Sequence, residues 1–501
     1  MIMDNNVLWV LIAIQIFMGA FDTVVHHEGS ERLAWRPSQK TELRLHGVRN
    51  FFYSVIFLCF AWSEPHGLFA VVLAAILIAE VLITLWDFVE EDLTRRLPCT
   101  ERINHTLLAL NYGAILALLV PFLWEWAFLP TKIVPTSYGW WSAMATLAAM
   151  GVGLFSVRDL MAASRSDRLD RGDPAKLVEG LPPRQHVLVT GGTGFVGKRL
   201  VEALVAAGHF VTVLTRDPRK AEDLAHPVRM ITDLEQVHNA DRVDVIVNLA
   251  GDPIANWLWT ATKRARIISS RVEMTKALER LVKRLDDQPK CLINGSAIGW
   301  YGFQGDAILS EEATSAPAFV HDVCDSWEKA ALDVEKEGVR VVRLRTGLVL
   351  GVEGGMLARL LTPTEFGGGV IMGSGEQWMS WIEQDDLIRV IAHAIADETL
   401  RGAVNATAPE PVRNRDFTRA LARALHRPVS FSAPAWVLEK LLGEMGRETM
   451  LGGQRVVPTK LLRTGFPFRH PEIEPMLHRI TGAKVVPSLS NETWARSATP
   501  L

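Results

Sequence analysis

The sequence predicts an α/β protein, with a doubly wound parallel sheet and a small C-terminal α/β subdomain, preceded by an all-α transmembrane domain. Three observations predict this fold class. Apolar runs long enough to cross a bilayer are confined to the first third of the 501 residues. A short β run, a glycine-rich turn and a helix follow one another from His186. Strand and helix patterns then alternate up to about residue 400, as in parallel sheets.

These patterns divide the chain, because 501 residues exceed what one hydrophobic core usually supports. We expect a helical membrane domain of about five spans, a solvated and flexible linker rich in Arg and Asp, the sheet domain, a C-terminal extension and a short tail. Their predicted boundaries are 1–157, 158–184, 185–400, 401–485 and 486–501.

The composition argues against several classes of protein. The formal net charge of −3 gives no basis for nucleic-acid binding. The four cysteines are scattered without CxxC spacing, which argues against a disulfide framework or a cysteine zinc site. The sheet domain therefore suits a reducing cytosol. Nothing in the composition fixes the oligomeric state.

The membrane domain is predicted from hydropathy. Its apolar runs lie at about 7–25, 67–86, 105–128 and 138–157, with a shorter run near 48–62. A cleaved signal peptide is the alternative for the first run. Residues 1–6 carry no basic side chain and no small-residue cleavage site follows, so a membrane anchor is favoured.

Basic residues predict the orientation, because Lys and Arg are retained on the cytoplasmic side of a membrane. They follow the first and third spans, whereas the opposite loops offer little beyond Lys132. The N-terminus is therefore expected outside, and an odd number of spans puts the sheet domain in the cytoplasm. We expect a multi-pass protein in contact with the lipid of a membrane such as the bacterial inner membrane. The basic residues concerned are Arg32, Arg36, Lys40, Arg44 and Arg49, then Arg95, Arg96 and Arg102.

Acidic residues and histidines recur four positions apart near the cytoplasmic ends of these helices. This spacing puts both side chains of a pair on one helix face, so several helices can converge on a carboxylate and imidazole metal site. The alternative is that these charges pair with the neighbouring arginines, and it stays open. The pairs are Asp22 with His26, Glu42 with His46, Asp87 with Glu91, and Glu101 with His105; the candidate metal ligands are Asp22, His26, His46, Asp87, Glu91 and His105.

The turn after the first strand of the sheet domain predicts a dinucleotide site of the Rossmann type. Gly191 permits a tight turn, Gly194 lets the backbone approach a pyrophosphate, and Gly197 lets the following helix pack closely, with the phosphate at the helix N-terminus. The turn residues assigned to the cofactor are Thr190, Gly191, Gly192, Thr193, Gly194, Phe195, Val196 and Gly197.

The end of the second strand distinguishes between two cofactors. An acidic residue there binds the ribose hydroxyls of NAD, and an arginine accommodates the 2′-phosphate of NADP. Arg216 directly follows Thr215, which favours NADP(H); the alternative is that Asp217 binds the ribose. Further candidate cofactor contacts are Asp233, Asn248, Leu249, Ala250, Gly251 and Arg271.

The motifs TGGTGFVG and NLAG resemble the extended short-chain dehydrogenase/reductase superfamily. The segments Ser296–Gly302, Trp327–Glu328, Arg343–Gly347 and Gly373–Gln377 are similar to its atypical, epimerase-like branch, whose C-terminal extension, DUF1731, has unknown function. The resemblance covers essentially everything after Gln185 and leaves the helical N-terminus outside. It implies a Rossmann fold, NAD(P) binding, and oxidoreductase or epimerase chemistry on an unknown small molecule.

The chain departs from that superfamily at its usual catalytic dyad, YxxxK, in which the lysine lowers the pKa of the tyrosine. Tyr301 is the only tyrosine after residue 138, and Gly305 stands four positions later. Where the resemblance would place the dyad, the chain has Val320 and Cys324. Binding of a cofactor is therefore better supported than any particular reaction.

The resemblance implies replacements for the dyad and a substrate side. Ser296 stands where the superfamily serine binds the reacting oxygen, and Tyr301 follows it closely, so this pair is our catalytic prediction. The alternatives are a serine satisfied by backbone and a packed aromatic ring. Gln377, Trp378 and Trp381 stand where the superfamily closes its substrate pocket, although Trp381 suits a core position equally.

Three functions remain open. The first is an NADP-dependent oxidoreductase or epimerase acting on a nucleotide-sugar or lipid-linked substrate. The second is a cofactor-binding sensor or scaffold without catalysis. The third is a metal centre in the helical domain that receives electrons from the sheet domain.

Overall fold

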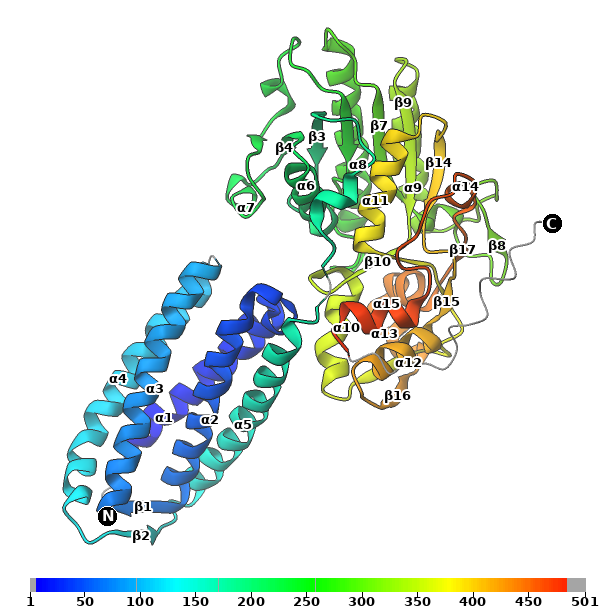
Figure 1. Ribbon diagram of the computed structural model, residues 1–501. Coiled ribbons are helices and arrows are strands. Elements are labelled where there is room, and N and C mark those ends of the chain that lie inside the picture. Colours follow the sequence, from blue (N-terminus) through cyan, green and yellow to red (C-terminus); the bar gives the residue numbers. More distant parts are fainter. Residues whose placement is uncertain (1–5, 96, 170, 257, 484–501) are drawn as a thin grey trace, which may run out of the picture. The chain divides into compact units, whose positions relative to one another are not determined.

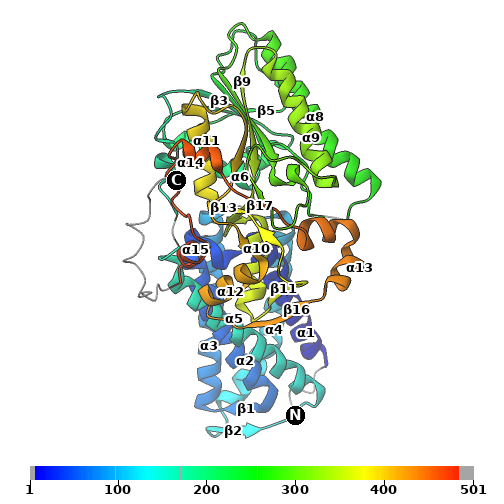
Figure 2. The same cartoon turned by 90° about the vertical axis from the view of Figure 1, so that its right-hand side faces the viewer.

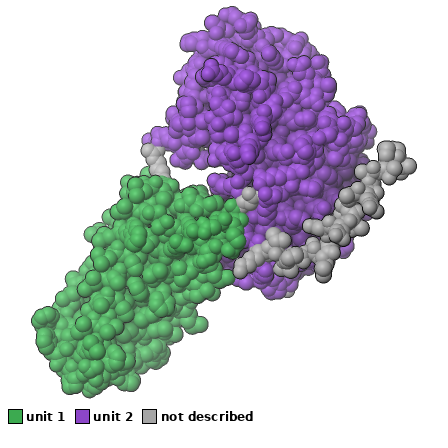
Figure 3. Space-filling view, in the orientation of Figure 1, with its two compact units in different colours: residues 1–169 green, residues 170–501 purple. Residues whose placement is uncertain are grey.

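The computed structural model describes residues 6–95, 97–169, 171–256 and 258–483, and the chain forms two compact units (Figure 3). Unit 1 is Met1–Leu169 and unit 2 is Asp170–Leu501. The predicted tail, 486–501, lies outside the described residues.

Unit 1 is a bundle in which long helices lie side by side (Figure 1). Among the described residues, four helical segments are long and apolar enough to cross a membrane: Asn6–Trp35, Leu68–Thr94, Cys99–Ala127 and Trp140–Ser166. The fifth expected span is a helix but falls short of that hydropathy, because its first half is charged. The helices are α1 (Asn6–Phe21), α2 (Lys40–Trp62), α3 (Leu68–Thr94), α4 (Cys99–Ala127) and α5 (Trp140–Ser166).

A two-stranded sheet closes one end of the bundle. Strands β1 (Ser63–His66) and β2 (Lys132–Pro135) pair antiparallel, so the α2–α3 and α4–α5 connections meet there. The basic loops after α1 and α3 therefore lie at the opposite end, as the alternation of basic residues predicts.

Small residues let α2 and α5 pack closely. A Cβ on Gly47 would lie 2.6 Å from Cγ of Leu160. Ser156 Oγ donates to the carbonyl oxygen of Gly47 at 2.6 Å, and Ser54 Oγ donates to that of Ala149 at 2.9 Å. Close backbone approach at small residues is typical of helices that associate in lipid.

Unit 2 is built on a seven-stranded parallel sheet with the order β5-β4-β3-β6-β7-β9-β14 (Figures 1 and 2). The order reverses between β3 and β6, and ligands of such sheets bind beyond the carboxyl ends of the strands at this point. The strands are β3 (His186–Thr190), β4 (Phe210–Leu214), β5 (Arg229–Ile231), β6 (Val245–Asn248), β7 (Cys291–Ala297), β9 (Arg340–Thr346) and β14 (Gly402–Ala406).

Two layers of helices cover the sheet, because alternate strand residues point to opposite faces. Val187 and Val189 pack in the cluster formed with α6 (Phe195–Ala206) and α11 (Gln384–Ala396). Leu188 packs in the cluster formed with α8 (Ala261–Arg284) and α9 (Phe319–Glu335), which lie side by side in Figure 2.

Smaller elements complete unit 2. Strand pairs β10–β13 and β11–β16 are parallel, β12–β15 is antiparallel, and β17 pairs with β8. The elements are α7 (Pro218–Ala221), β8 (Ile308–Leu309), β10 (Leu348–Gly351), α10 (Gly355–Glu365), β11 (Gly369–Met372), β12 (Trp378–Met379), β13 (Trp381–Glu383), β15 (Val412–Arg413), α12 (Asn414–Ala424), β16 (Val429–Ala433), α13 (Ala435–Gly446), β17 (Arg455–Val456), α14 (Thr459–Arg463) and α15 (Ile473–Ile480).

Two predicted boundaries differ from the structure. The stretch 158–184 is not a solvated linker: α5 continues to Ser166, and Leu177, Val178 and Leu181 are buried in the core of unit 2. The sheet also continues past residue 400, because β14 pairs with β9 and fills the sheet edge. Charged residues in the stretch 158–184 concealed its buried part.

Candidate functional site

The glycine-rich turn after β3 forms a close-packed cradle. Gly191 has φ +71°, and a Cβ there would lie 2.7 Å from the carbonyl carbon of Leu249. A Cβ on Gly197 would overlap the carbonyl oxygen of Gly191. The amide of Gly194 donates to that carbonyl at 3.0 Å, and Gly194 caps α6 without a side-chain hydrogen bond. The helix N-terminus is therefore bare backbone, as phosphate binding requires.

Arg216 is a cationic residue at the end of β4, the strand that pairs with β3. It directly follows Thr215 after β4, it is exposed, and within the described residues it makes no hydrogen bond or ion pair. The neighbouring Asp217 is engaged, since its carboxylate accepts from the amide of Arg219 at 3.2 Å and caps α7. This arrangement leaves the arginine, rather than the carboxylate, available to a cofactor.

Thr190 and Asn248 form a buried network beneath the turn. Thr190 Oγ1 donates to Asn248 Oδ1 at 2.6 Å, and Asn248 Nδ2 donates to Thr275 and Asn294 at 3.1 and 2.7 Å. Both residues are fully buried. They join β3, β6, β7 and α8, so they shape the cradle from below.

The other candidate cofactor contacts lie nearer the surface. Leu249 and Ala250 are half-buried and Gly251 is exposed after β6. Arg271 donates to the carbonyl oxygens of Asp252 and Ile267 at 3.0 and 2.8 Å and packs over a tryptophan ring. Asp233 is exposed and accepts from the amide of Glu235, capping its own turn.

Ser296 and Tyr301 belong to one buried polar network. Ser296 Oγ donates to Glu328 Oε1 at 2.7 Å, and Arg345 donates to both oxygens of Glu328 at 2.8 and 3.0 Å. The Arg345 guanidinium lies 5.0 Å from the ring centroid of Tyr301, whose hydroxyl donates to Asn405 Oδ1 at 2.7 Å. The structure thus brings the predicted pair together and engages both hydroxyls.

Burial favours the protonated forms of the Tyr301 hydroxyl and the Cys324 thiol. It raises the pKa of the Tyr301 hydroxyl, although the Arg345 charge opposes the shift. It also raises the pKa of the Cys324 thiol to about 11. Val320 and Cys324 lie one turn apart on the buried side of α9. Neither Tyr301 nor Cys324 has the lowered pKa that a dyad lysine would give.

The predicted substrate residues are held by the protein itself. Gln377 Nε2 donates to the carbonyls of Met372 and Met450 at 3.0 and 2.8 Å. Trp378 Nε1 donates to Asp306 at 2.8 Å, with an arginine over its ring. Trp381 has 0% exposure and donates to the Glu410 carbonyl at 3.0 Å, so it fills the core rather than lining a pocket.

In unit 1, three histidines surround Asp22. His26 Nδ1 lies 2.8 Å from Oδ1, and His27 Nε2 and His105 Nε2 lie 3.2 and 3.0 Å from Oδ2. The other nitrogen of His26 faces Thr100 at 3.2 Å. Residue His27, absent from the prediction, therefore belongs to the cluster, and His26 lies at its edge.

His46, Asp87 and Glu91 form the adjoining part of the cluster. His46 Nε2 lies 3.0 Å from Asp87 Oδ2 and 3.8 Å from Glu91 Oε1. His105 Nδ1 lies 3.3 Å from Glu91 Oε2 and links the two parts. Five of the six predicted ligands are thus brought together by α2, α3, α4 and the segment after α1.

Arginines partner some of the carboxylates, as the alternative interpretation expected. Arg95 donates to Glu42 and Glu101 at 3.0 and 2.7 Å, and Arg49 donates to Asp87 at 2.6 Å. The carboxylates of Asp22 and Glu91 face mainly histidines instead.

His27 was missed because the chain after α1 does not wind as an α-helix. Asp22–Glu31 is a π-helix, in which the amide of Arg32 donates to the carbonyl of His27 five residues back. The wider turn carries residues five apart to one face, so Asp22 meets His27 as well as His26. A search of the sequence for pairs five apart would have found it.

Unit 2 is similar to known protein families. Residues 187–406 match the NAD dependent epimerase/dehydratase family, and residues 433–480 match a domain of unknown function, DUF1731. The epimerase family protein YfhF of Bacillus subtilis is 35% identical over 292 residues, 58% of this chain and 95% of that protein. The Arabidopsis thaliana epimerase family protein SDR39U1 homolog, chloroplastic, is 36% identical over 301 residues, 59% of this chain and 86% of that protein.

Solved structures agree with the fold. The human epimerase family protein SDR39U1, isoform 2, solved with NADPH, has 30% identity and a TM-score of 0.54, covering 59% of this chain and 99% of that one. A UDP-glucose 4-epimerase of Thermotoga maritima, at 19% identity and TM-score 0.50, shares the fold over 59% of this chain and 97% of that one. The chain therefore belongs to the NAD dependent epimerase/dehydratase family, with a DUF1731 domain following its Rossmann domain.

Proposed function

We propose that the chain is a membrane-anchored, NADP(H)-binding member of the epimerase family. The observation that carries the proposal is Arg216, exposed and unpaired among the described residues at the end of β4, while Asp217 is used as a helix cap. The 30% identical human relative, which was solved with NADPH, supports the same cofactor.

The residues of unit 2 fit such a cofactor. The glycine cradle admits no Cβ at Gly191 or Gly197, and the uncapped amides at the start of α6 suit the pyrophosphate. Arg216 would pair with the 2′-phosphate, which NAD(H) lacks. When bound, NADP(H) supplies hydride transfer at its nicotinamide.

Titration of the purified chain with NADPH and NADH tests the assignment. Arg216→Ala should weaken NADPH binding about 10- to 100-fold, the loss of a charge-assisted hydrogen bond, and change NADH binding little. Arg280→Ala removes an exposed arginine from the outer face of α8 and serves as the control. If Arg216→Ala changed the affinities for NADPH and NADH by the same factor, the assignment would be refuted.

We infer an oxidoreductase or epimerase-like reaction on a nucleotide-sugar or lipid-linked alcohol or carbonyl compound. Ser296 supports it, because its hydroxyl lies at the carboxyl end of β7 on a buried carboxylate that can hold its proton. Conversion of such compounds to product by the chain with bound NADP(H) should fall at least about 100-fold in Ser296→Ala. If the reaction rate is unchanged by this substitution, the Ser296 hydroxyl has no catalytic role.

A cofactor-binding sensor is the second candidate. The observation that favours it is that both candidate hydroxyls are already hydrogen-bonded inside the protein, to Glu328 and Asn405. For a sensor we expect tight NADPH binding in Ser296→Ala and Tyr301→Phe and no turnover in the parent chain. Any turnover that depends on either hydroxyl favours the enzyme.

The anchor is proposed from the apolar helices of unit 1. We expect the chain in the membrane fraction, released by detergent and retained in carbonate wash. Reporter fusions at the C-terminus should show it in the cytoplasm, and fusions in the α2–α3 or α4–α5 connection should show those loops outside. A C-terminus found outside would overturn the five-span orientation.

A further inference from the structure

Unit 1 buries more negative charge than positive charge around its histidines. Five carboxylates are at most 4% exposed, and two arginines, Arg49 and Arg95, are in contact with them. An isolated buried carboxylate is strongly unfavourable, so the remaining charge has to be balanced at the histidines, by protons on the imidazoles or by a bound cation. The carboxylates are Asp22, Glu42, Asp87, Glu91 and Glu101.

The nitrogen and oxygen atoms of the cluster converge on two adjoining points. Ligand atoms of Asp22, His27, Glu101 and His105 all lie within 4.8 Å of one another, and so do those of His27, His46 and Glu91. The rings of His27 and His46 stack with centroids 4.5 Å apart. His27 belongs to both groups and stands at the centre.

Several of these atoms lack hydrogen bonds although they are buried. Within the described residues, His27 Nε2, His46 Nε2 and both carboxylate oxygens of Glu91 have no hydrogen-bond partner. Their residues are 8%, 2% and 1% exposed. Carboxylate oxygens lie 3.0 to 3.8 Å from the two nitrogens, but the directions do not fit a hydrogen bond. Buried nitrogen and oxygen atoms that gather within 4.8 Å of one another without hydrogen bonds are suited to bind a metal ion.

We propose that this cluster binds one or two divalent first-row transition-metal ions, with ligands from Asp22, His27, Glu101 and His105 at one point and from His27, His46 and Glu91 at the other. Imidazole and carboxylate together suit iron, manganese and zinc, whereas calcium and magnesium prefer oxygen alone. Arg95 and Arg49 hold Glu42 and Asp87 in the surrounding layer, where such partners orient ligands, and Arg95 also contacts Glu101.

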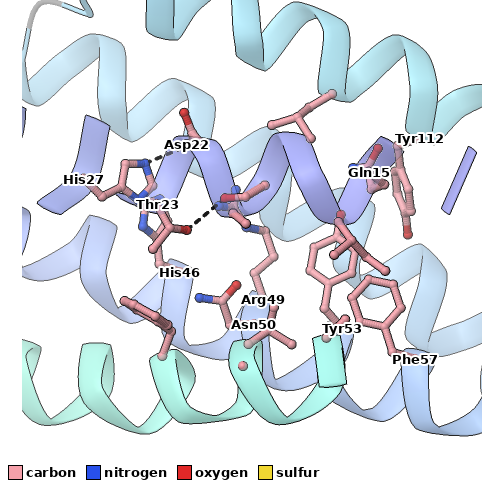
Figure 4. Close-up of a pocket in the computed structure, with 18 of the residues that line it drawn as sticks. Gln15, Asp22, Thr23, His27, His46, Arg49, Asn50, Tyr53, Phe57 and Tyr112 are labelled. Carbon is pink, nitrogen blue, oxygen red and sulfur yellow. Dashed lines mark hydrogen bonds and ion pairs between the residues drawn. The ribbon is translucent and has the colours of Figure 1, made fainter. Parts of the chain in front are cut away.

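A cavity of about 510 Å³ borders the site. Figure 4 shows Asp22, His27 and His46 at one end of it and Phe57 and Tyr112 at the other. The metal therefore faces space for a ligand from outside the protein, as in catalytic rather than closed structural metal sites. The lining away from the metal is mostly apolar and suits a hydrophobic molecule.

The test begins with the full-length chain purified in detergent without chelators. Elemental analysis is made before and after dialysis against Fe²⁺, Mn²⁺ or Zn²⁺, and we expect one or two ions per chain. Titration of the stripped chain with Co²⁺ should give visible d–d absorption of an imidazole-containing site. These readouts do not depend on NADPH or on turnover.

Variants distinguish this site from adventitious binding. His46→Gln and Glu91→Gln should each lower metal affinity at least about tenfold and change the Co²⁺ spectrum. His66→Gln is the matched control, since His66 is also buried without a hydrogen bond but has only Glu64 beside it among the carboxylates of the described residues. It should bind metal like the parent.

Folding is followed in every variant by helical circular dichroism and gel filtration. If Glu91→Gln fails to fold, Glu91→Asp keeps the charge and should still shift the Co²⁺ spectrum. Fewer than 0.1 ions per chain after dialysis against each metal, roughly the level of trace contamination, overturns the proposal. So does metal affinity in folded His46→Gln equal to that of His66→Gln.

Discussion

At the scale of single residues, Tyr301 shows how a hydroxyl can be placed for structure. Its ring is fully buried beside Arg345, and its hydroxyl donates to Asn405. The sequence indicates that Tyr301 lies near Ser296, because only four residues separate them and Tyr301 lies in the short helix directly after the end of β7. It could not reveal Asn405, which lies about one hundred residues away on β14.

Tyr301→Phe should lower the free energy of unfolding by about 1–3 kcal/mol, because Asn405 Oδ1 would stay buried without its donor. Thermal unfolding of the full-length chain in detergent, followed by tryptophan fluorescence, measures the change. Unchanged stability with lost turnover would instead assign the hydroxyl to catalysis.

Glu383 should make unit 2 less stable as the pH rises. Burial beside Asp385 raises the pKa of Glu383 to about 8 from an ordinary 4.5. The folded state therefore holds a proton that the unfolded chain has lost between these values, so stability falls with pH across that window, by at most about 1.4 kcal/mol per unit.

Glu383→Gln removes this proton exchange and should flatten the decline between pH 5 and 8. The amide of Asp386 donates to Glu383 Oε2 at 3.0 Å, and the side-chain oxygen of the glutamine can accept the same hydrogen bond. Exposed Glu335→Gln on α9 is the control. Parallel stability curves for the parent and Glu383→Gln would contradict the expectation.

At the scale of elements, Gly197 joins α6 to the turn before it. A Cβ at this position would overlap the carbonyl oxygen of Gly191, so Gly197→Ala must move α6 away from β3. We expect NADPH affinity to fall at least about tenfold, since about 1.4 kcal/mol is lost when the phosphate cradle opens. Calorimetric titration measures it.

Gly180→Ala is the comparison for that change. No atom lies within 4 Å of a Cβ at Gly180, and the residue is exposed, so affinity should stay as in the parent. An equal loss in both variants would point to general destabilisation rather than to the cradle.

The same scale explains what the sequence predicted and what it missed. Glycine spacing predicts the β3–α6 turn because each glycine meets a local steric demand. The candidate cluster of unit 1 was predicted from pairs four residues apart. That spacing does not include His27, which the π-helix brings to the same side as Asp22. Arg95 was assigned only to a basic loop, because its contacts with Glu42 and Glu101 join three helices.

At the scale of the whole molecule, each unit has its own core. The clusters of unit 2 draw on the sheet and its two helix layers, and the cluster of unit 1 on helices α1 to α5. A chain lacking residues 1–169 should stay in solution, bind NADPH within about threefold of the parent and bind no transition metal. Failure to bind NADPH would show that unit 2 needs unit 1.

The charged face of α2 has a consequence for how the protein is made. Glu42, His46 and Arg49 meet their partners on α3 and at Arg95 directly after it, so α2 released alone into lipid would expose unpaired charges. A nascent chain that ends after α2 should therefore remain at the membrane surface, and entry of α2 should await α3. We therefore expect cooperative insertion of the bundle, with the pair of helices α2 and α3 as its smallest insertable piece.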